Sequence, residues 1–215
     1  MDGIPPETAP GKHLPAASTR VWGMAGSPRR HGNTEALLDR FLAGAESAGA
    51  HAEKTLLARL KIADCVACER CFESGLCSIH DDFDEVYERF LAADVVVLAA
   101  PLYFWNLPAQ AKALVDRSEG QWARKHVLMA PSPSTPGGHR RRRGVFISTA
   151  GQPGADFHGA MQTVGGFFDV WETDLWGKLL YSEVDAKGSI QAHPTALRDA
   201  YELGKRAVTE AWSEA

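Results

Sequence analysis

The chain has 215 residues, 45% of them hydrophobic, and a formal net charge of −4 with acidic and basic residues interspersed. This length and composition suit one α/β domain with a full core and fit two large domains poorly. The small negative charge gives no electrostatic reason to expect a nucleic-acid partner. The longest apolar run, residues 95–101, has the length of a strand and is too short to cross a membrane.

The first residues are rich in proline and poor in large apolar side chains. They lack both the apolar centre of a signal peptide and the amphipathic, Arg- and Ser-rich pattern of a transit peptide. We therefore expect a flexible N-terminal tail over residues 1–19, a single domain over residues 20–213 and a cytoplasmic location.

The pattern of strands and helices begins after this tail. We expect a buried strand at Arg20–Ala25, then a turn-rich loop and an amphipathic helix that Asn33 or Thr34 is placed to cap. A weaker strand is expected at His51–Leu57. A cysteine loop then occupies residues 62–80.

The next segment carries the strongest strand signal of the chain. A helix is expected to start at Asp82, which forms a capping-box pattern with Glu85. Residues 94–100 (DVVVLAA) are almost continuously apolar, which is typical of a central parallel strand covered on both faces. Pro108 suits the first turn of a further helix that ends at Arg117.

A segment rich in Pro, Gly and Ser, residues 129–143, interrupts this rhythm and ends in four arginines. We interpret it as a surface insertion with a solvated arginine run. The remaining elements are expected at Gly144–Thr149 (strand), Phe157–Phe168 (helix), Leu175–Tyr181 (strand) and Pro194–Trp212 (helix). Five strands alternating with helices predict a doubly wound parallel sheet, in which ligands bind at the carboxyl ends of the strands.

The loop after the first strand, residues 26–34, reads GSPRRHGNT. It leads into a helix N-terminus, whose unpaired N–H groups and partial positive charge suit a phosphate. Ser27, Asn33 and Thr34 can donate hydrogen bonds, and Arg29 can add a charge-assisted one. The loop matches neither the dinucleotide fingerprint nor the P-loop pattern. The alternative is an ordinary Ser/Asn cap on a polar turn.

The loop after the third strand, residues 101–108, reads PLYFWNLP. Tyr103, Phe104 and Trp105 are three consecutive aromatic residues at the carboxyl edge of the expected sheet. Such residues can stack on a flat tricyclic ring while nearby backbone groups bind its polar atoms. Alternatively, these side chains fill the core or a subunit interface.

These two loops, with the segments CVACERCFESGLCSIHDDF, ADVVVLAAPLYFWNLPAQAKALVDR and STAGQPG, resemble the NAD(P)H-dependent FMN reductase family of the flavodoxin-like fold. Within that family the likeness is to iron–sulfur flavoproteins, and it covers about residues 20–210. The resemblance implies a five-stranded sheet of order 2-1-3-4-5 with FMN at its carboxyl edge. It also implies a homodimer or homotetramer with the flavin near a subunit contact.

The resemblance also implies three groups of FMN-binding residues. Those at the phosphate are Ser27, Arg29, Asn33 and Thr34. Those along the ribityl chain and the isoalloxazine ring are Pro101, Leu102, Tyr103, Phe104 and Trp105. Those at the polar edge of the ring are Thr149, Ala150 and Gly151.

All four cysteines lie in one short segment, as Cys65, Cys68, Cys71 and Cys77, with the spacing C-x2-C-x2-C-x5-C. Four thiolates in one loop can ligate a [4Fe–4S] cluster, and the spacing is similar to that of iron–sulfur flavoproteins. A tetrahedrally coordinated zinc ion is an alternative occupant of this site. Free thiols, a reversible disulfide or simple packing of small side chains are the others.

These observations predict an oxidoreductase in which NAD(P)H reduces bound FMN, which then passes electrons to a small acceptor such as a quinone or a flavin. A [4Fe–4S] cluster would add a one-electron route. Because the cofactor performs the chemistry, we expect no catalytic side chain. Two alternatives are an electron carrier fed by ferredoxin without nicotinamide turnover, and a non-catalytic redox-sensing binding module.

Overall fold

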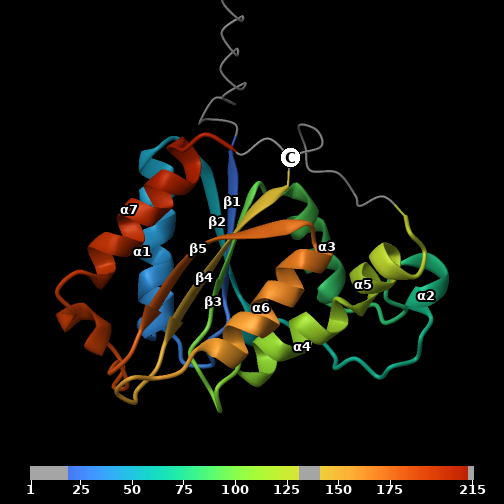
Figure 1. The fold of residues 1–215 in the computed structure, drawn as a ribbon, viewed down its shortest axis with the longest axis horizontal. Coiled ribbons are helices and arrows are strands. Elements are labelled where there is room, and N and C mark those ends of the chain that lie inside the picture. Colours follow the sequence, from blue (N-terminus) through green and yellow to red (C-terminus); the bar gives the residue numbers. More distant parts are fainter. Residues whose placement is uncertain (1–18, 131–140, 213–215) are drawn as a thin grey trace, which may run out of the picture.

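The computed structural model describes residues 19–130 and 141–212. Within these residues five parallel strands form one sheet in the order β2-β1-β3-β4-β5, as the resemblance implies (Figure 1). The strands are β1 (Arg20–Ala25), β2 (His51–Leu56), β3 (Val95–Ala99), β4 (Arg142–Thr149) and β5 (Thr173–Tyr181).

Helices cover both faces of this sheet (Figure 1). One face carries α1 (Asn33–Ser47) and α7 (Ala196–Thr209), which pack side by side. The other face carries α3 (Phe83–Ala92), α4 (Ala109–Arg117) and α6 (His158–Val170). The shorter elements are η2 (Leu57–Arg59), α2 (Cys71–Ser74), α5 (Glu119–His126) and η3 (Ser189–Ala192). None of the helices in the described ranges is both long and apolar enough to cross a membrane.

The hydrophobic core forms two layers, one on each side of β3. Side chains of a strand alternate between its faces, so Val95 and Val97 pack toward α1 and α7, and Val96 and Leu98 pack toward α3, α4 and α6. Every residue of β3 is buried. The continuous apolar run therefore has the central, doubly covered position that the sequence predicts.

The last two arginines of the run are not solvated as we expected. Residues 131–140 lie outside the described residues, but β4 begins at Arg142, and the side chains of Arg142 and Arg143 are buried. Arg142 donates to the carbonyl oxygen of Trp171 at 3.0 Å. Arg143 donates to the carbonyl oxygen of Ala207 in α7 at 2.8 Å. Backbone carbonyls at the ends of helices thus accept from these guanidinium groups inside the fold.

Two expected helix caps are also wrong in detail. Helix α1 starts after Gly32 without a side-chain cap. Helix α3 starts after Asp82, whose carboxylate accepts from the backbone N–H of Lys61 at 2.7 Å and makes no cap hydrogen bond. In both cases the side chain that we expected to cap the helix, Asn33 or Asp82, instead binds a segment elsewhere in the fold. The expected tail falls almost entirely outside the described residues.

Candidate functional site

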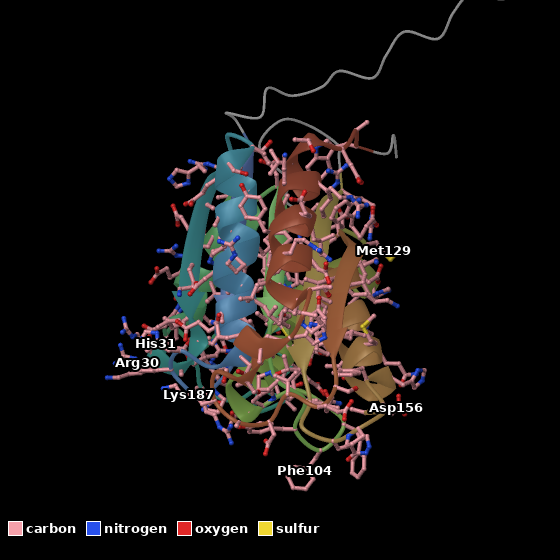
Figure 2. All side chains as sticks on the ribbon, turned by 90° about the vertical axis from the view of Figure 1, so that its left-hand side faces the viewer. Arg30, His31, Phe104, Met129, Asp156 and Lys187 are labelled. Carbon is pink, nitrogen blue, oxygen red and sulfur yellow. The ribbon has the colours of Figure 1, made fainter. Side chains whose placement is uncertain are left out.

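Loops that follow β1, β3, β4 and β5 meet in a groove at the carboxyl edge of the sheet, which is the lower edge in Figure 2. The groove contains all of the predicted FMN-binding residues except Phe104 and Trp105. Its lining residues are Ser27, Arg29, Gly32, Asn33, Thr34, Pro101, Leu102, Tyr103, Thr149, Ala150, Gly151, Val184, Asp185 and Lys187.

The first wall of the groove is the loop that leads into α1. The hydroxyl of Ser27 accepts a hydrogen bond from the backbone N–H of Arg29 at 3.1 Å, which closes a tight turn. Because α1 has no side-chain cap, its first N–H groups are available to an anion in the groove. The positive end of the helix dipole points the same way.

A buried carboxylate beneath this loop fixes its shape. Glu35 accepts from the backbone N–H of His31 at 2.6 Å and from the ammonium of Lys54 in β2 at 3.0 Å. His31 has a left-handed backbone with φ 53°, which is uncommon for a residue other than glycine. Burial raises the pKa of Glu35, but the hydrogen bonds from Lys54 and His31 outweigh it and leave that pKa below its usual value.

The second wall is the loop after β5, which we did not predict as part of the site. The amide of Asn33 donates to the carbonyl oxygen of Ala186 and accepts from the backbone N–H of Gly188, both at 2.9 Å. Arg29 donates to the carbonyl oxygen of Asp185 at 3.1 Å. Asn33 therefore connects the loop after β1 to the loop after β5 through hydrogen bonds. The rule that ligands collect at the carboxyl ends of parallel strands applies to β5 as well, and it could have indicated this loop.

The aromatic loop after β3 divides into an inner and an outer part. Pro101, Leu102 and Tyr103 line the groove. Phe104 and Trp105 occupy a turn with φ of 48° and 61°, and 93% and 59% of their surfaces are exposed. Figure 2 shows Phe104 projecting from the lower edge of the molecule. These two side chains therefore lie outside the groove of the single chain, and their contact with FMN stays a prediction.

The groove fits an FMN phosphate and the polar edge of a flavin in the chemistry of its donors. Uncapped helix N–H groups, two hydroxyls and the Arg29 guanidinium meet at one end. Gly151 provides close backbone access beside the loop after β5, where a Cβ would lie 2.9 Å from the Cβ of Asp185. The arrangement offers binding and orientation, because none of its lining residues forms a nucleophile–base pair.

A second, larger cavity lies beside α4, α5 and α6, and all four cysteines line it. Its volume is about 750 Å³. Cys65 and Cys68 are exposed, Cys71 and Cys77 are half-buried, and all four are free thiols. Four thiols are the kind of donor set that binds a four-iron cluster. In the described part of the chain, however, no three His, Cys, Asp or Glu side chains stand close enough together to hold a metal ion.

The thiols differ in their electrostatic surroundings. Burial raises the pKa of Cys71, and the nearby Glu119, Cys77 and Cys65 raise it further. A hydrogen bond from the backbone N–H of Arg70 lowers the pKa of Cys68, and a contact with Ser78 adds to this effect. Cys68 is therefore more readily ionised than Cys71 at a given pH.

Comparisons with known proteins agree with this geometry. The model of the NADPH-dependent FMN reductase family matches residues 19–154. An iron-sulfur flavoprotein of Methanosarcina thermophila is 40% identical over 99 residues, which are 46% of this chain and 52% of that protein. An iron-sulfur flavoprotein of Methanocaldococcus jannaschii is 31% identical over 154 residues, which are 71% of this chain and 72% of that protein.

The match to the Methanosarcina protein thus spans about half of that relative's length. Among solved structures, an NAD(P)H:quinone oxidoreductase from Methanothermobacter marburgensis has a TM-score of 0.62 and 19% identity, covering 92% of this chain and 99% of that one. Identity this low shows the fold alone. The family match covers well over half of the chain, and this protein belongs to the NADPH-dependent FMN reductase family.

Proposed function

We propose that this protein is an FMN-dependent oxidoreductase that takes electrons from NAD(P)H and passes them to a small acceptor such as a quinone or a flavin. The observation that carries the proposal is the groove in which the loops after β1, β3 and β4 meet beside an uncapped helix N-terminus. Membership of the FMN reductase family supports it. A solved structure with the same fold is described as an NAD(P)H:quinone oxidoreductase.

The residues of the groove have binding and orienting roles in this proposal. Ser27, Thr34, Arg29 and the first N–H groups of α1 bind the FMN phosphate, while Asn33 holds the loop after β5 against them. The groove residues that follow β3 and β4 lie along the ribityl chain and the polar edge of the ring. When bound, FMN accepts a hydride and releases electrons, so the protein needs no nucleophile of its own.

The exposed aromatic side chains support the proposal that more than one chain builds the working enzyme. Phe104 and Trp105 lie next to the groove and are exposed to solvent. Large exposed apolar side chains beside a binding site are typical of an interaction surface. The proposal therefore includes a homodimer or homotetramer in which these side chains are covered near the flavin.

The cysteines extend the proposal to a [4Fe–4S] cluster. Cys65, Cys68, Cys71 and Cys77 would hold it, since all four line one cavity. Such a cluster, when bound, supplies a one-electron route alongside the two-electron chemistry of the flavin. Two relatives described as iron-sulfur flavoproteins favour this reading.

The test is reduction of the FMN-loaded protein by NADH or NADPH without oxygen, followed by addition of a quinone. We expect the visible flavin band to bleach with the nicotinamide and to return with the quinone. A flavin that bleaches with dithionite or reduced ferredoxin, but with neither nicotinamide, would overturn the proposal in favour of an electron carrier.

A matched pair of variants tests the location of the FMN. Both Arg29 and its neighbour Arg30 are exposed, but Arg29 lines the groove and Arg30 does not. We expect Arg29→Ala to raise the Kd for FMN by roughly fivefold to tenfold, because it removes a charge-assisted contact with the phosphate. Arg30→Ala should change the Kd by less than about twofold. Equal effects of the two substitutions would contradict the proposed phosphate site.

A further inference from the structure

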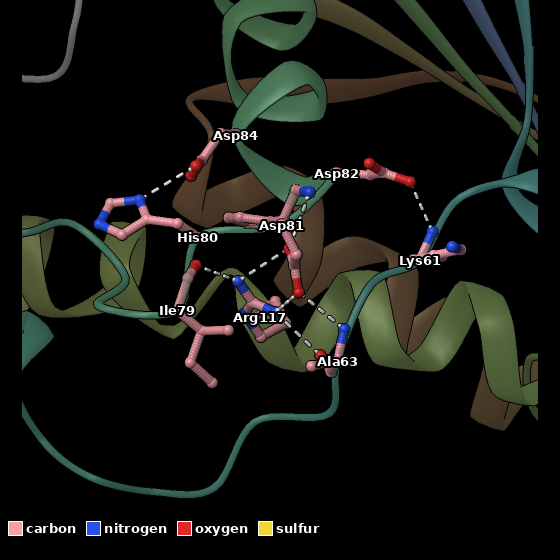
Figure 3. Close-up of polar contacts among 9 residues, drawn as sticks. Lys61, Ala63, Ile79, His80, Asp81, Asp82, Asp84 and Arg117 are labelled. Atoms are coloured by element: carbon pink, nitrogen blue, oxygen red, sulfur yellow. Dashed lines mark hydrogen bonds and ion pairs between the residues drawn. The ribbon is translucent and has the colours of Figure 1, made fainter.

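A buried arginine lies under the cysteine loop. The side chain of Arg117, at the end of α4, has no exposed surface. It donates to the carbonyl oxygens of Ala63 at 3.0 Å and Ile79 at 2.8 Å (Figure 3). Those two residues stand at opposite ends of the cysteine-bearing segment. One guanidinium therefore binds the backbone at both the start and the end of the cysteine loop.

Asp81 completes the attachment. It accepts from Arg117 at 2.7 and 3.3 Å through its two oxygens, which is a bidentate pair. The same carboxylate accepts from the backbone N–H of Ala63 at 2.8 Å and of Phe83 at 2.9 Å. Figure 3 shows Arg117, Asp81 and the two ends of the loop converging. We call Arg117 and Asp81 the loop clasp.

Burial of the Arg117 guanidinium costs free energy, so its retention needs a structural explanation. Burial of a guanidinium is expensive unless a charge and hydrogen-bond acceptors compensate it. Arg117 makes four hydrogen bonds through its two terminal nitrogens. Its Nε is buried and has no hydrogen-bond partner among the described residues. An apolar side chain would fill the same space without this cost, but it could not join two backbone segments.

Apart from the clasp, a few contacts at the base and on one side hold the loop. Between the clasped ends, α2 (Cys71–Ser74) is the one regular element in the structure described. On the outer side the loop rests on α5, where Phe72 lies against Trp122 with ring centroids 5.9 Å apart. Gly120 permits this approach, since a Cβ there would stand 3.1 Å from the carbonyl oxygen of Gly75. At the base, the backbone N–H of Lys61 also donates to Asp82 at 2.7 Å, and the clasp adds the buried, charged part of this closure.

The clasp also adjoins the thiols. Arg117 and the four cysteines line the same cavity. Burial lowers the pKa of Arg117, but its interactions with Asp81 and then Cys77 outweigh burial and raise it. The guanidinium and Cys77 therefore border the same cavity.

We propose that Arg117, through its pair with Asp81, is the positioning residue of the cysteine site. It holds both ends of the loop so that the four thiols face one cavity before any iron binds, and it sets a fixed positive charge near Cys77. The part of this inference that concerns iron rests on the proposed function. The part that concerns the order of the loop does not.

The experiment compares Asp81→Asn and Arg117→Lys with wild type and with Asp84→Asn as the matched control. Asp84 belongs to the same helix start, but its partner is the exposed His80 at 3.1 Å. Arg117→Lys keeps the positive charge, yet one ammonium cannot reach Asp81 and both carbonyls together. Asp81→Asn leaves the guanidinium in place, which keeps the test open if the lysine variant does not fold.

The first measurement uses an aromatic disulfide reagent on the iron-free, FMN-loaded proteins. Wild type and Asp84→Asn should react in two phases, because two thiols are exposed and two are half-buried. In the clasp variants the slow phase should accelerate by about tenfold or more, because the loop opens locally. Slow phases that are equal in all four proteins would overturn the proposal.

The second measurement is reconstitution with iron and sulfide, reported as iron per bound FMN. The clasp variants should retain about tenfold less iron than wild type at limiting iron, with unchanged FMN content. Iron and FMN that fall together would overturn the proposal, since that result means a general loss of fold. Iron uptake by Arg117→Lys that equals that of wild type would also overturn the proposal. If wild type itself takes up no iron, the cluster proposal fails, and the thiol rates alone decide the role of the clasp.

Discussion

Glu35 connects the stability of the chain to the shape of the phosphate loop. It is one of the few buried acidic residues, and it faces the backbone of the loop on one side and Lys54 on the other. A carboxylate with two charge-assisted hydrogen bonds stabilises the folded state only while it is ionised. This single side chain therefore makes the first wall of the groove sensitive to acid.

We expect Glu35→Gln to lower the free energy of unfolding at neutral pH by about 1–2 kcal/mol, because the charged contacts with Lys54 and His31 are weakened. The pKa of Glu35 is lowered from 4.5, so its contribution is fully present above that pH and is lost as the pH falls through the folded-state pKa. Urea unfolding of both proteins across this range measures the difference. A gap between them that stays constant with pH would contradict the role of the ionised carboxylate.

Single residues of the site differed in how well the sequence predicted them. Ser27 and Thr34 follow from a local rule, because a strand that runs into a helix places hydroxyls at the helix N-terminus. Asn33 obeys the same rule, but its amide binds a loop more than 150 residues further along the chain. The outward direction of the Phe104 side chain could not be predicted, since two consecutive left-handed residues determine it. Such choices depend on tertiary contacts that a local pattern does not contain.

The contact between helices α1 and α7 depends on two glycines. A Cβ on Gly44 would overlap the backbone at Tyr201, and a Cβ on Gly204 would overlap the backbone at Phe41. The two helices therefore touch through their main chains, and they carry much of the core on their face of the sheet. Close packing of this kind tolerates added volume poorly.

We expect Gly204→Ala to destabilise the protein by about 1–3 kcal/mol, since the methyl group forces the helices apart. Gly165→Ala is the control, because a Cβ at that position in α6 meets nothing within 4 Å. The control should be neutral or stabilising by up to about 1 kcal/mol, through its better helix propensity. Urea midpoints of the two variants provide the measurement, and a neutral Gly204→Ala would show that the helices are not in such close contact.

Strand β4 shows why composition alone wrongly predicted that its arginines are solvated. Four consecutive arginines after a Pro- and Gly-rich segment are typical of a solvated loop. Arg143 is nevertheless enclosed by the rings of Trp176 and Trp212, at 5.0 and 4.0 Å from their centroids. The carbonyls at the end of α7 accept its hydrogen bonds. Aromatic faces and helix-terminal carbonyls make such a burial stable, and both come from remote segments.

For the whole molecule, the alternation of apolar segments was sufficient to predict the doubly wound sheet. The parallel arrangement follows because every pair of successive strands is separated by a helix, and right-handed crossovers leave few topologies. The two candidate sites have different origins in this framework. The groove follows from the topology, which gathers the strand ends at one edge. The cysteine cavity depends on a loop that packs beside α4, α5 and α6, and only its donor set could be predicted from the sequence.

The most direct test of this account is an absorption spectrum of the protein purified without oxygen, with flavin and iron assayed on the same sample. We predict flavin bands from one FMN per chain, together with a broad iron–sulfur absorption that bleaches with dithionite and about four irons per chain. Flavin without iron would contradict the cluster while leaving the FMN groove intact. A colourless protein that also fails to bind added FMN would contradict the central claim that this groove is a flavin site.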